Sequence, residues 1–263
     1  MLTMLKGYSA ILVKNGKGKV VNEWVAAEAA YELFLDNRRV ETIVVSPAEL
    51  KAHAVGFIVT EGMAQPEQIE SVREEGRHIF VNTKDHVSTP ADRTLWRSSA
   101  YRGSEEGSIN PVTSNVAVET EVIVQCAQQI LRQATNWEKT GGLHISLLFD
   151  VRGELVAVAE DIGRHNSVDK VVGYAVLHDV PLTETILACS GRQPEGMVLK
   201  AARARIPIVV TKAAVTDRGI ETAEHLGVTL IGFARDDRFT IYCHPERIQG
   251  VSGEDNDGSS NSS

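Results

Sequence analysis

The chain has 263 residues, of which 43% are hydrophobic and 24% are charged, a composition typical of globular proteins. It argues against a collagen-like, disordered or membrane-embedded chain, and the length allows one large domain or two smaller ones. The formal net charge is −8. Duplex-binding proteins normally carry a basic surplus, so nucleic acid is not an expected partner.

Cysteine usage and hydropathy indicate a cytoplasmic protein. Cys126, Cys189 and Cys243 are widely spaced and form no C-x-x-C motif, so neither a disulfide framework nor a cysteine-rich zinc site is expected. The histidines show no paired metal-ligand spacing, and we expect no protein-bound metal. The sequence has neither an apolar run of about 18 residues nor a signal-peptide core, so we expect neither membrane insertion nor export.

Two changes of composition divide the chain. Residues 83–115 are polar and rich in Ser, Gly and Asn, and the last residues contain almost no apolar side chains. We therefore expect an N-terminal α+β part over residues 1–82, a long polar loop over 83–115, an α/β/α domain over 116–250 and a disordered tail over 251–263.

The N-terminal part is predicted to contain a helix and a hairpin. The run SPAE at residues 46–49 has the form of a capping box, and apolar residues at helical spacing follow to about Thr60, before Gly62. In the preceding run VAAEAAYELFLDNRRVETIVVS the alanines favour a helix, whereas Asp36-Asn37 between two apolar runs favours a β-hairpin. We favour the hairpin.

The C-terminal part is predicted to be a mixed sheet between helices. Val118, Val122, Cys126 and Ile130 recur every four residues, which indicates an amphipathic helix to about residue 134. Apolar runs typical of strands follow at residues 144–149, 155–159, 185–189, 207–211 and 228–233. Helices are predicted to begin near Asn166, Pro194 and Thr216 and to connect parallel strands, while the turn at residues 150–153 joins the first two strands as a hairpin.

The loops that follow the parallel strands are the candidate site, because ligands bind at the carboxyl ends of such strands. The candidate residues in these loops are Asp161, Gly163, Arg164, His165, Asn166, Ser190, Gly191, Arg192, Ala234, Arg235, Asp236, Asp237 and Arg238, with residues 212–216 between them. Helix starts and arginines both bind phosphate, so a phosphorylated ligand is the predicted occupant. Alternatively, Asn166 is only an N-cap with Asp169 at its third position, and Arg164 and His165 are structural partners of Asp161.

The cysteines are weaker candidates. Cys126 and Cys189 fall on apolar stripes and are expected to be buried, whereas Cys243 beside His244 is expected to be more accessible and is a weak catalytic candidate.

Five blocks in order resemble the FdhD/NarQ family of formate dehydrogenase accessory proteins, over about residues 24–248. They are VGFIVTEG (55–62), TGGLH (140–144), EDIGRHNSVDKVVG (160–173), CSGR (189–192) and VTLIGFARDDRFTIY (228–242). The resemblance implies a cytidine-deaminase-like α/β/α fold, usually dimeric and without the deaminase zinc.

The resemblance also implies a function. Members of the family receive sulfur from a cysteine desulfurase and pass it to the bis(molybdopterin guanine dinucleotide) molybdenum cofactor before that cofactor enters formate dehydrogenase. The family's cofactor-binding stretch corresponds to Phe233, Ala234, Arg235, Asp236, Asp237 and Arg238 in this sequence. GDP and similar nucleotides should then act as mimics of the cofactor.

This sequence departs from the family pattern in three places. The family's C-x-x-C lies in the loop before the TGG-H block, but here that loop reads SSAYRGSEEGSINP (98–111) and has no cysteine. The family's acidic residue after SGR falls at Gly196, and its Pro-Thr pair is replaced by Val215-Thr216. A sulfurtransferase using another cysteine, a cofactor-binding chaperone without sulfur transfer, and an unrelated enzyme on the same scaffold all remain possible.

Overall fold

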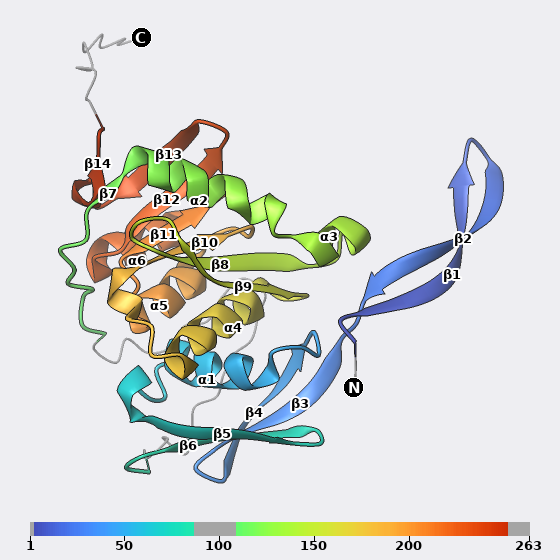
Figure 1. The fold of residues 1–263 in the computed structure, drawn as a ribbon, viewed down its shortest axis with the longest axis horizontal. Helices are drawn as coiled ribbons and strands as arrows, with labels where there is room; N and C mark the ends of the chain where they lie inside the picture. The colour runs from blue at the N-terminus through green and yellow to red at the C-terminus, as the bar shows by residue number, and fades with distance from the viewer. Residues whose placement is uncertain (1–2, 87–108, 252–263) are drawn as a thin grey trace.

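The computed structural model describes residues 3–86 and 109–251, and its centre is a six-stranded mixed sheet (Figure 1). The strand order is β13-β12-β11-β10-β8-β9. The strands are β8 (His144–Asp150), β9 (Leu155–Asp161), β10 (Thr185–Cys189), β11 (Ile208–Thr211), β12 (Thr229–Arg235) and β13 (Arg238–Cys243). Strands β10, β11 and β12 are parallel, whereas β8 runs antiparallel to both β9 and β10. The predicted mixed sheet, with its β8–β9 hairpin, is confirmed.

Helices cover both faces of this sheet, as predicted. One face carries α2 (Thr120–Arg132), and the other carries α4 (Arg164–Leu177), α5 (Glu195–Arg203) and α6 (Asp217–Leu226). The alternation of β8 explains the two layers: Leu147 packs in the same cluster as Cys126 of α2, whereas Leu148 packs with Val168 of α4. Shorter elements complete this part: α3 (Thr135–Thr140), β7 (Val118–Glu119), β14 (Ile248–Gln249), and the 3₁₀ turns η2 (Leu182–Glu184) and η3 (Pro245–Arg247).

A second, four-stranded sheet lies in the N-terminal part, with α1 (Leu50–Thr60) on one face. Its order is β4-β3-β6-β5. The strands are β3 (Ala29–Leu35), β4 (Arg38–Val45), β5 (Ile69–Glu75) and β6 (His78–Thr83), with η1 (Pro66–Gln68) before β5. Asp36 and Asn37 adopt positive φ angles of 49° and 64° in the turn between β3 and β4. The predicted hairpin is confirmed there, and the helical alternative is wrong.

Helix α1 joins the two parts of the molecule by packing directly on α4 (Figure 1). A Cβ atom on Gly56 would lie 1.7 Å from the Asp169 carbonyl oxygen, and one on Gly173 would lie 1.8 Å from that of Ala52. The two helix backbones are therefore in contact, and only glycine fits at either position.

The start of α1 differs from the prediction. The helix begins at Leu50 after Glu49, which has a positive φ of 56°, so Ser46 does not cap it. Ser46 instead donates its backbone NH to Asp161 Oδ2 (3.0 Å), and its Oγ accepts from the NH of Ile162 (3.2 Å). The predicted capping box is wrong because a carboxylate 115 residues away competes for Ser46. The predicted end of the helix at Thr60, before Gly62, is confirmed.

The structure also contains an element that the sequence analysis missed. Strands β1 (Leu5–Lys14) and β2 (Lys17–Ala26) form a two-stranded hairpin that projects from the rest of the molecule (Figure 1). Most of the predicted polar loop and all of the predicted tail after Val251 lie outside the described residues. Within the described residues no helix is long and apolar enough to cross a membrane.

Candidate functional site

The predicted loops follow strands that end at one edge of the large sheet. Strands β10, β11 and β12 are parallel, and β9 points the same way because β8 lies antiparallel between it and β10. The same edge receives the start of β8, which brings His144 to the loops. The sequence analysis did not include His144 in the site. Its position at the start of an antiparallel strand beside β10 is the signal that could have shown it.

Arg164, Ser190 and Gly191 lie together with His144 at this edge. Ser190 Oγ accepts from the NH of Ile145 (3.1 Å) and lies 3.4 Å from His144 Nδ1. A Cβ atom on Gly191 would lie 3.1 Å from Arg164 Cβ and Cδ, and 3.5 Å from His144 Nδ1. The arginine stem and the imidazole therefore lie over the bare backbone of Gly191, and a larger residue there would displace them.

The electrostatics of this group favour an anion. Partial burial lowers the pKa of Arg164, and the nearby charge of Arg192 lowers it further. Burial also lowers the pKa of His144, and Arg164 adds to the effect. Desolvated positive charges that repel one another are stabilised when an anion lies between them. The imidazole of His165 lies close to Gly196 in the first turn of α5, since a Cβ atom added to Gly196 would be 3.8 Å from His165 Nε2. His165 therefore brings a second imidazole to this part of the sheet edge.

The loops after β10, β11 and β12 are joined by hydrogen bonds into one row. Thr211 Oγ1 donates to the carbonyl of Gly191 (2.7 Å), and the NH of Gln193 donates to Ala214 (3.1 Å). The NH of Phe233 donates to the carbonyl of Ala213 (3.0 Å). A movement of one of these loops would therefore move the neighbouring loops as well.

The segment from Phe233 to Arg238 forms the far end of this row. Phe233 has a positive φ of 51° and is 43% exposed, while Ala234 is buried. Arg235, Asp236, Asp237 and Arg238 are all exposed around the β12–β13 turn. Strands β12 and β9 are separated by three strands, or about 19 Å at the usual strand spacing. An extended ligand is needed to contact both ends.

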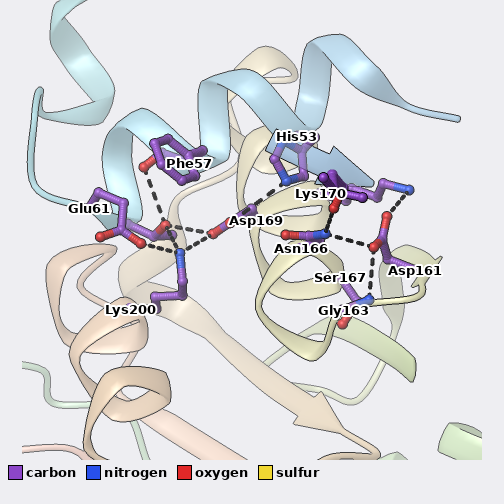
Figure 2. Close-up of polar contacts among 12 residues, drawn as sticks. His53, Phe57, Glu61, Asp161, Gly163, Asn166, Ser167, Asp169, Lys170 and Lys200 are labelled. Carbon is purple, nitrogen blue, oxygen red and sulfur yellow. Dashed lines mark hydrogen bonds and ion pairs between the residues drawn. The ribbon is translucent and has the colours of Figure 1, made fainter. Parts of the chain in front are cut away.

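Three predicted site residues instead shape the loop from within (Figure 2). Asp161 is fully buried and pairs with Lys170 Nζ at 2.8 Å. Its Oδ1 accepts from the Gly163 NH (2.9 Å) and from Asn166 Nδ2 (2.8 Å). Gly163, not Asn166, is the N-cap of α4. The suggested N-cap at Asn166 is therefore wrong, because its amide is bound to Asp161 and to the Val44 carbonyl (2.9 Å).

A second buried ionic group lies where α1, α4 and α5 meet, and no sequence pattern pointed to it. Lys200 Nζ lies 2.7 Å from Asp169 Oδ1 and 2.8 Å from Glu61 Oε1, and it donates to Thr60 Oγ1 (2.9 Å) (Figure 2). His53 is fully buried beside it, with Nε2 4.0 Å from Asp169 Oδ2. Burial lowers the pKa of His53 to about 3. The group holds the N-terminal part against the large sheet's helices.

The three cysteines are all buried. Burial raises the pKa of Cys126 to about 12, and those of Cys189 and Cys243 to about 11. The expectation of an accessible Cys243 is wrong, because α6 covers the end of β13 and Cys243 Sγ donates to the carbonyl of Ile220 (3.4 Å). No group of three potential metal ligands occurs within residues 3–86 and 109–251.

Comparisons with known proteins agree with the motifs. The model of the FdhD/NarQ family matches residues 26–249. The chain belongs to the FdhD/NarQ family. Protein FdhD of Methanocaldococcus jannaschii is 34% identical over 222 residues, which cover 84% of this chain and 89% of that protein. The sulfur carrier protein FdhD of Sulfolobus acidocaldarius is 33% identical over 245 residues, 90% of this chain and 95% of that protein.

A solved structure has the same fold as this member of the family. It is a crystal structure of a protein described as a putative formate dehydrogenase accessory protein, from Desulfotalea psychrophila. It is 25% identical in sequence, has a TM-score of 0.80, and the match covers 93% of this chain and 99% of that one.

Proposed function

We propose that this protein binds the bis(molybdopterin guanine dinucleotide) molybdenum cofactor, as cargo, at the loop edge of the large sheet and delivers it to formate dehydrogenase. Family membership supports the proposal, because relatives are named sulfur carrier protein FdhD and the matching crystal structure is described as a formate dehydrogenase accessory protein. A homodimer is proposed as the working form.

The observation that carries the proposal is the position of Arg164 over Gly191, beside His144 and near Arg192. Two guanidinium groups hold phosphate oxygens in bidentate pairs, and Ser190 Oγ and the imidazole add hydrogen bonds. At the far end, the exposed ring of Phe233 offers a stacking surface to a guanine base, and base stacking contributes about 1–3 kcal/mol. A dinucleotide has the length and the two kinds of group that such a row of loops would bind.

GDP tests the site. At a concentration one hundred times its Kd, GDP should stabilise the protein by about 2.7 kcal/mol and raise the melting temperature by roughly 5–10 °C. Arg164→Ala and Arg235→Ala should each weaken binding at least about tenfold without unfolding the protein, because each removes a charge-assisted contact. Arg152→Ala is the control, since Arg152 is exposed at the β8–β9 turn, at the opposite edge of the sheet.

A GDP titration that leaves the melting temperature of the wild type unchanged at millimolar concentration would count against the proposal. Equal loss of affinity in Arg152→Ala would show that the effect does not depend on the position of the arginine, and so that this edge is not the binding site. A collapse of stability in Arg164→Ala would mean that Arg164 is a structural residue.

Sulfur transfer from a cysteine desulfurase is the second candidate function, and the thiols argue against it in this chain. A persulfide relay needs a reachable thiolate, whereas Cys126, Cys189 and Cys243 are buried with raised pKa values. The segment at residues 98–111 contains no cysteine. We therefore favour a cofactor-binding chaperone that does not carry sulfur on its own cysteines.

Intact-mass spectrometry tests this choice. After incubation with a cysteine desulfurase and cysteine, the wild type should gain no sulfur atom while its affinity for GDP is retained. A stoichiometric gain of one sulfur atom that disappears in Cys243→Ser, the weak catalytic candidate of the sequence analysis, would establish the sulfurtransferase instead.

A further inference from the structure

The projecting hairpin of β1 and β2, here called the arm, separates its charged and uncharged residues onto opposite faces. Residues directly opposite each other in an antiparallel pair share a face, and faces alternate along each strand. The register therefore gives one face with no charged residue: Leu5, Gly7, Ser9, Ile11, Val13, Gly18, Val20, Asn22, Trp24 and Ala26. The other face carries every charge of the arm: Lys6, Lys14, Lys17, Lys19 and Glu23, with Tyr8, Ala10, Leu12, Val21 and Val25.

The uncharged face is exposed to solvent. Ile11, Val13 and Val20 are 65–70% exposed and Trp24 is 54% exposed. A Cβ atom on Gly7 would lie 3.7 Å from the Trp24 ring, and one on Gly18 would lie 3.1 Å from Ile11 Cγ2. The large side chains therefore lie over glycines that leave room for them. An exposed cluster of large apolar side chains such as Ile11, Val13 and Val20 is typical of an interaction site.

The arm also needs a second surface for its own stability. An isolated two-stranded hairpin is marginally stable at best in water. At the base, the NH of Ala27 donates to the Met4 carbonyl (2.8 Å) and closes the hairpin, and the contact of β2 with α3 holds the arm to the body. The contact with α3 leaves the distant half, with Ile11, Val13 and Val20, exposed to solvent.

We propose that the uncharged face packs on the uncharged face of a second copy of this chain, with the two arms antiparallel about a two-fold axis. This inference rests on the homodimer proposed above and names its interface. A two-fold contact brings a surface onto itself, so only a face without net charge avoids repulsion. On the opposite face the same contact would bring lysine onto lysine.

Charge and size both favour a second copy as the occupant. Residues 1–26 contain four Lys and one Glu and so carry +3, whereas the whole chain carries −8 and the remainder therefore −11. Antiparallel arms bring the basic tip of each, at Lys14 and Lys17, toward the acidic body of the other copy. Each strand of the arm has ten residues and is about 33 Å long. One face of such a hairpin is too small to bury the roughly 800 Å² per partner of a stable interface. Contact between each arm and the partner's body would supply the rest of the buried area.

The arm lies outside the region that the family model matches. That match begins at residue 26, where β2 ends. The proposed interface therefore lies before the residues that the family model matches, and it adds to the function proposed for the loop edge without replacing it.

Two matched double variants of the full chain test the proposal. Ile11→Lys with Val20→Lys places two charges on the uncharged face, and Tyr8→Lys with Leu12→Lys places the same two charges on the other face. All four positions are more than half exposed, so neither pair disturbs the core. Analytical ultracentrifugation gives the dimer Kd, and a thermal melt and GDP titration on the same samples report folding and the loop edge.

The wild type and the Tyr8/Leu12 variant should be dimers, and the Ile11/Val20 variant should dissociate at least about a hundredfold more readily, because the added charges would be buried against the apolar side chains of the partner's arm. If the Ile11/Val20 double variant has a lowered melting temperature, the single variant Ser9→Lys takes its place. Ser9 lies at the middle of the same face, and this variant should dissociate the dimer as well.

Three results would overturn the proposal. The first is a wild type that is monomeric at about 100 µM, where an interface of this size should be occupied. The second is an Ile11/Val20 variant that dimerises like the wild type, which would place the interface elsewhere, and the third is equal dissociation of both variants. In each case, unchanged GDP binding would separate failure of the arm interface from failure of the loop-edge function.

Discussion

At the scale of single residues, the structure uses buried charge to hold its two parts together. Lys170 pairs with Asp161 and Lys200 pairs with Asp169 and Glu61, all buried. Removing one member leaves an uncompensated buried charge, which typically costs about 3–5 kcal/mol. Asp161 thus stabilises the loop that presents Arg164, so the loop contains a structural acid, Asp161, and an arginine that is proposed to bind the ligand, Arg164.

His53 predicts how stability depends on pH. Its pKa in the folded protein is about 3, lowered by burial, against about 6.5 when unfolded. The neutral form is therefore stabilised, and this contribution is complete above pH 6.5 and is lost as the pH falls toward 3. At pH 5 the loss from His53 alone should be about 2 kcal/mol.

Urea unfolding at pH 7.5 and pH 5 measures this effect. His53→Leu should lose less stability between the two pH values than the wild type, and His225→Gln, at an exposed position on α6, should behave like the wild type. The raised pKa of buried Asp169 is common to all three proteins and cancels in the comparison. Identical pH profiles for the wild type and His53→Leu would refute the assignment.

At the scale of elements, the contact of α1 with α4 depends on two glycines. Gly56→Ala would place a methyl group 1.7 Å from a backbone oxygen, so the helices must separate, and the free energy of unfolding should fall by about 3 kcal/mol or more. Gly142→Ala is the control, since its added atom would be at an ordinary 3.6 Å from Ala26 Cβ. Thermal unfolding of both variants distinguishes them, and equal stability would contradict close packing of the helices.

Periodicity predicted the C-terminal elements well and the N-terminal ones only in part. The helix stripe around Cys126 and the five apolar runs are local signals, and the structure places α2 and the strands there. The arm was missed because a strand exposed on both faces shows no alternation of buried and exposed residues.

The candidate site was predicted at the level of the loops but not of every residue. Parallel strands placed Arg164 and Gly191 at one edge, as expected from topology alone. The capping roles of Ser46 and Asn166 both failed because each residue binds Asp161, which is 115 residues from Ser46 and five residues from Asn166. Contacts between residues more than 100 apart, such as Lys200 with Glu61, leave no local pattern in the sequence.

At the scale of the whole molecule, the parts have separate tasks. The loop edge of the large sheet is proposed to hold the cofactor, the buried ionic groups and α1 fix the N-terminal sheet against α4, and the arm is proposed to join two copies. Because the arm and the loop edge use different elements, changes in one should leave the other intact.

Retention of the cofactor itself tests the central claim most directly. The full chain is incubated without oxygen with bis(molybdopterin guanine dinucleotide) cofactor released from a molybdoenzyme, and the protein fraction from gel filtration is assayed for molybdenum and guanine. The wild type and Arg152→Ala should retain both in stoichiometric amounts, and Arg164→Ala combined with Arg192→Ala should retain neither, because the phosphate contacts are lost. A wild type that retains no molybdenum, or a double variant that retains as much as the wild type, would contradict the account.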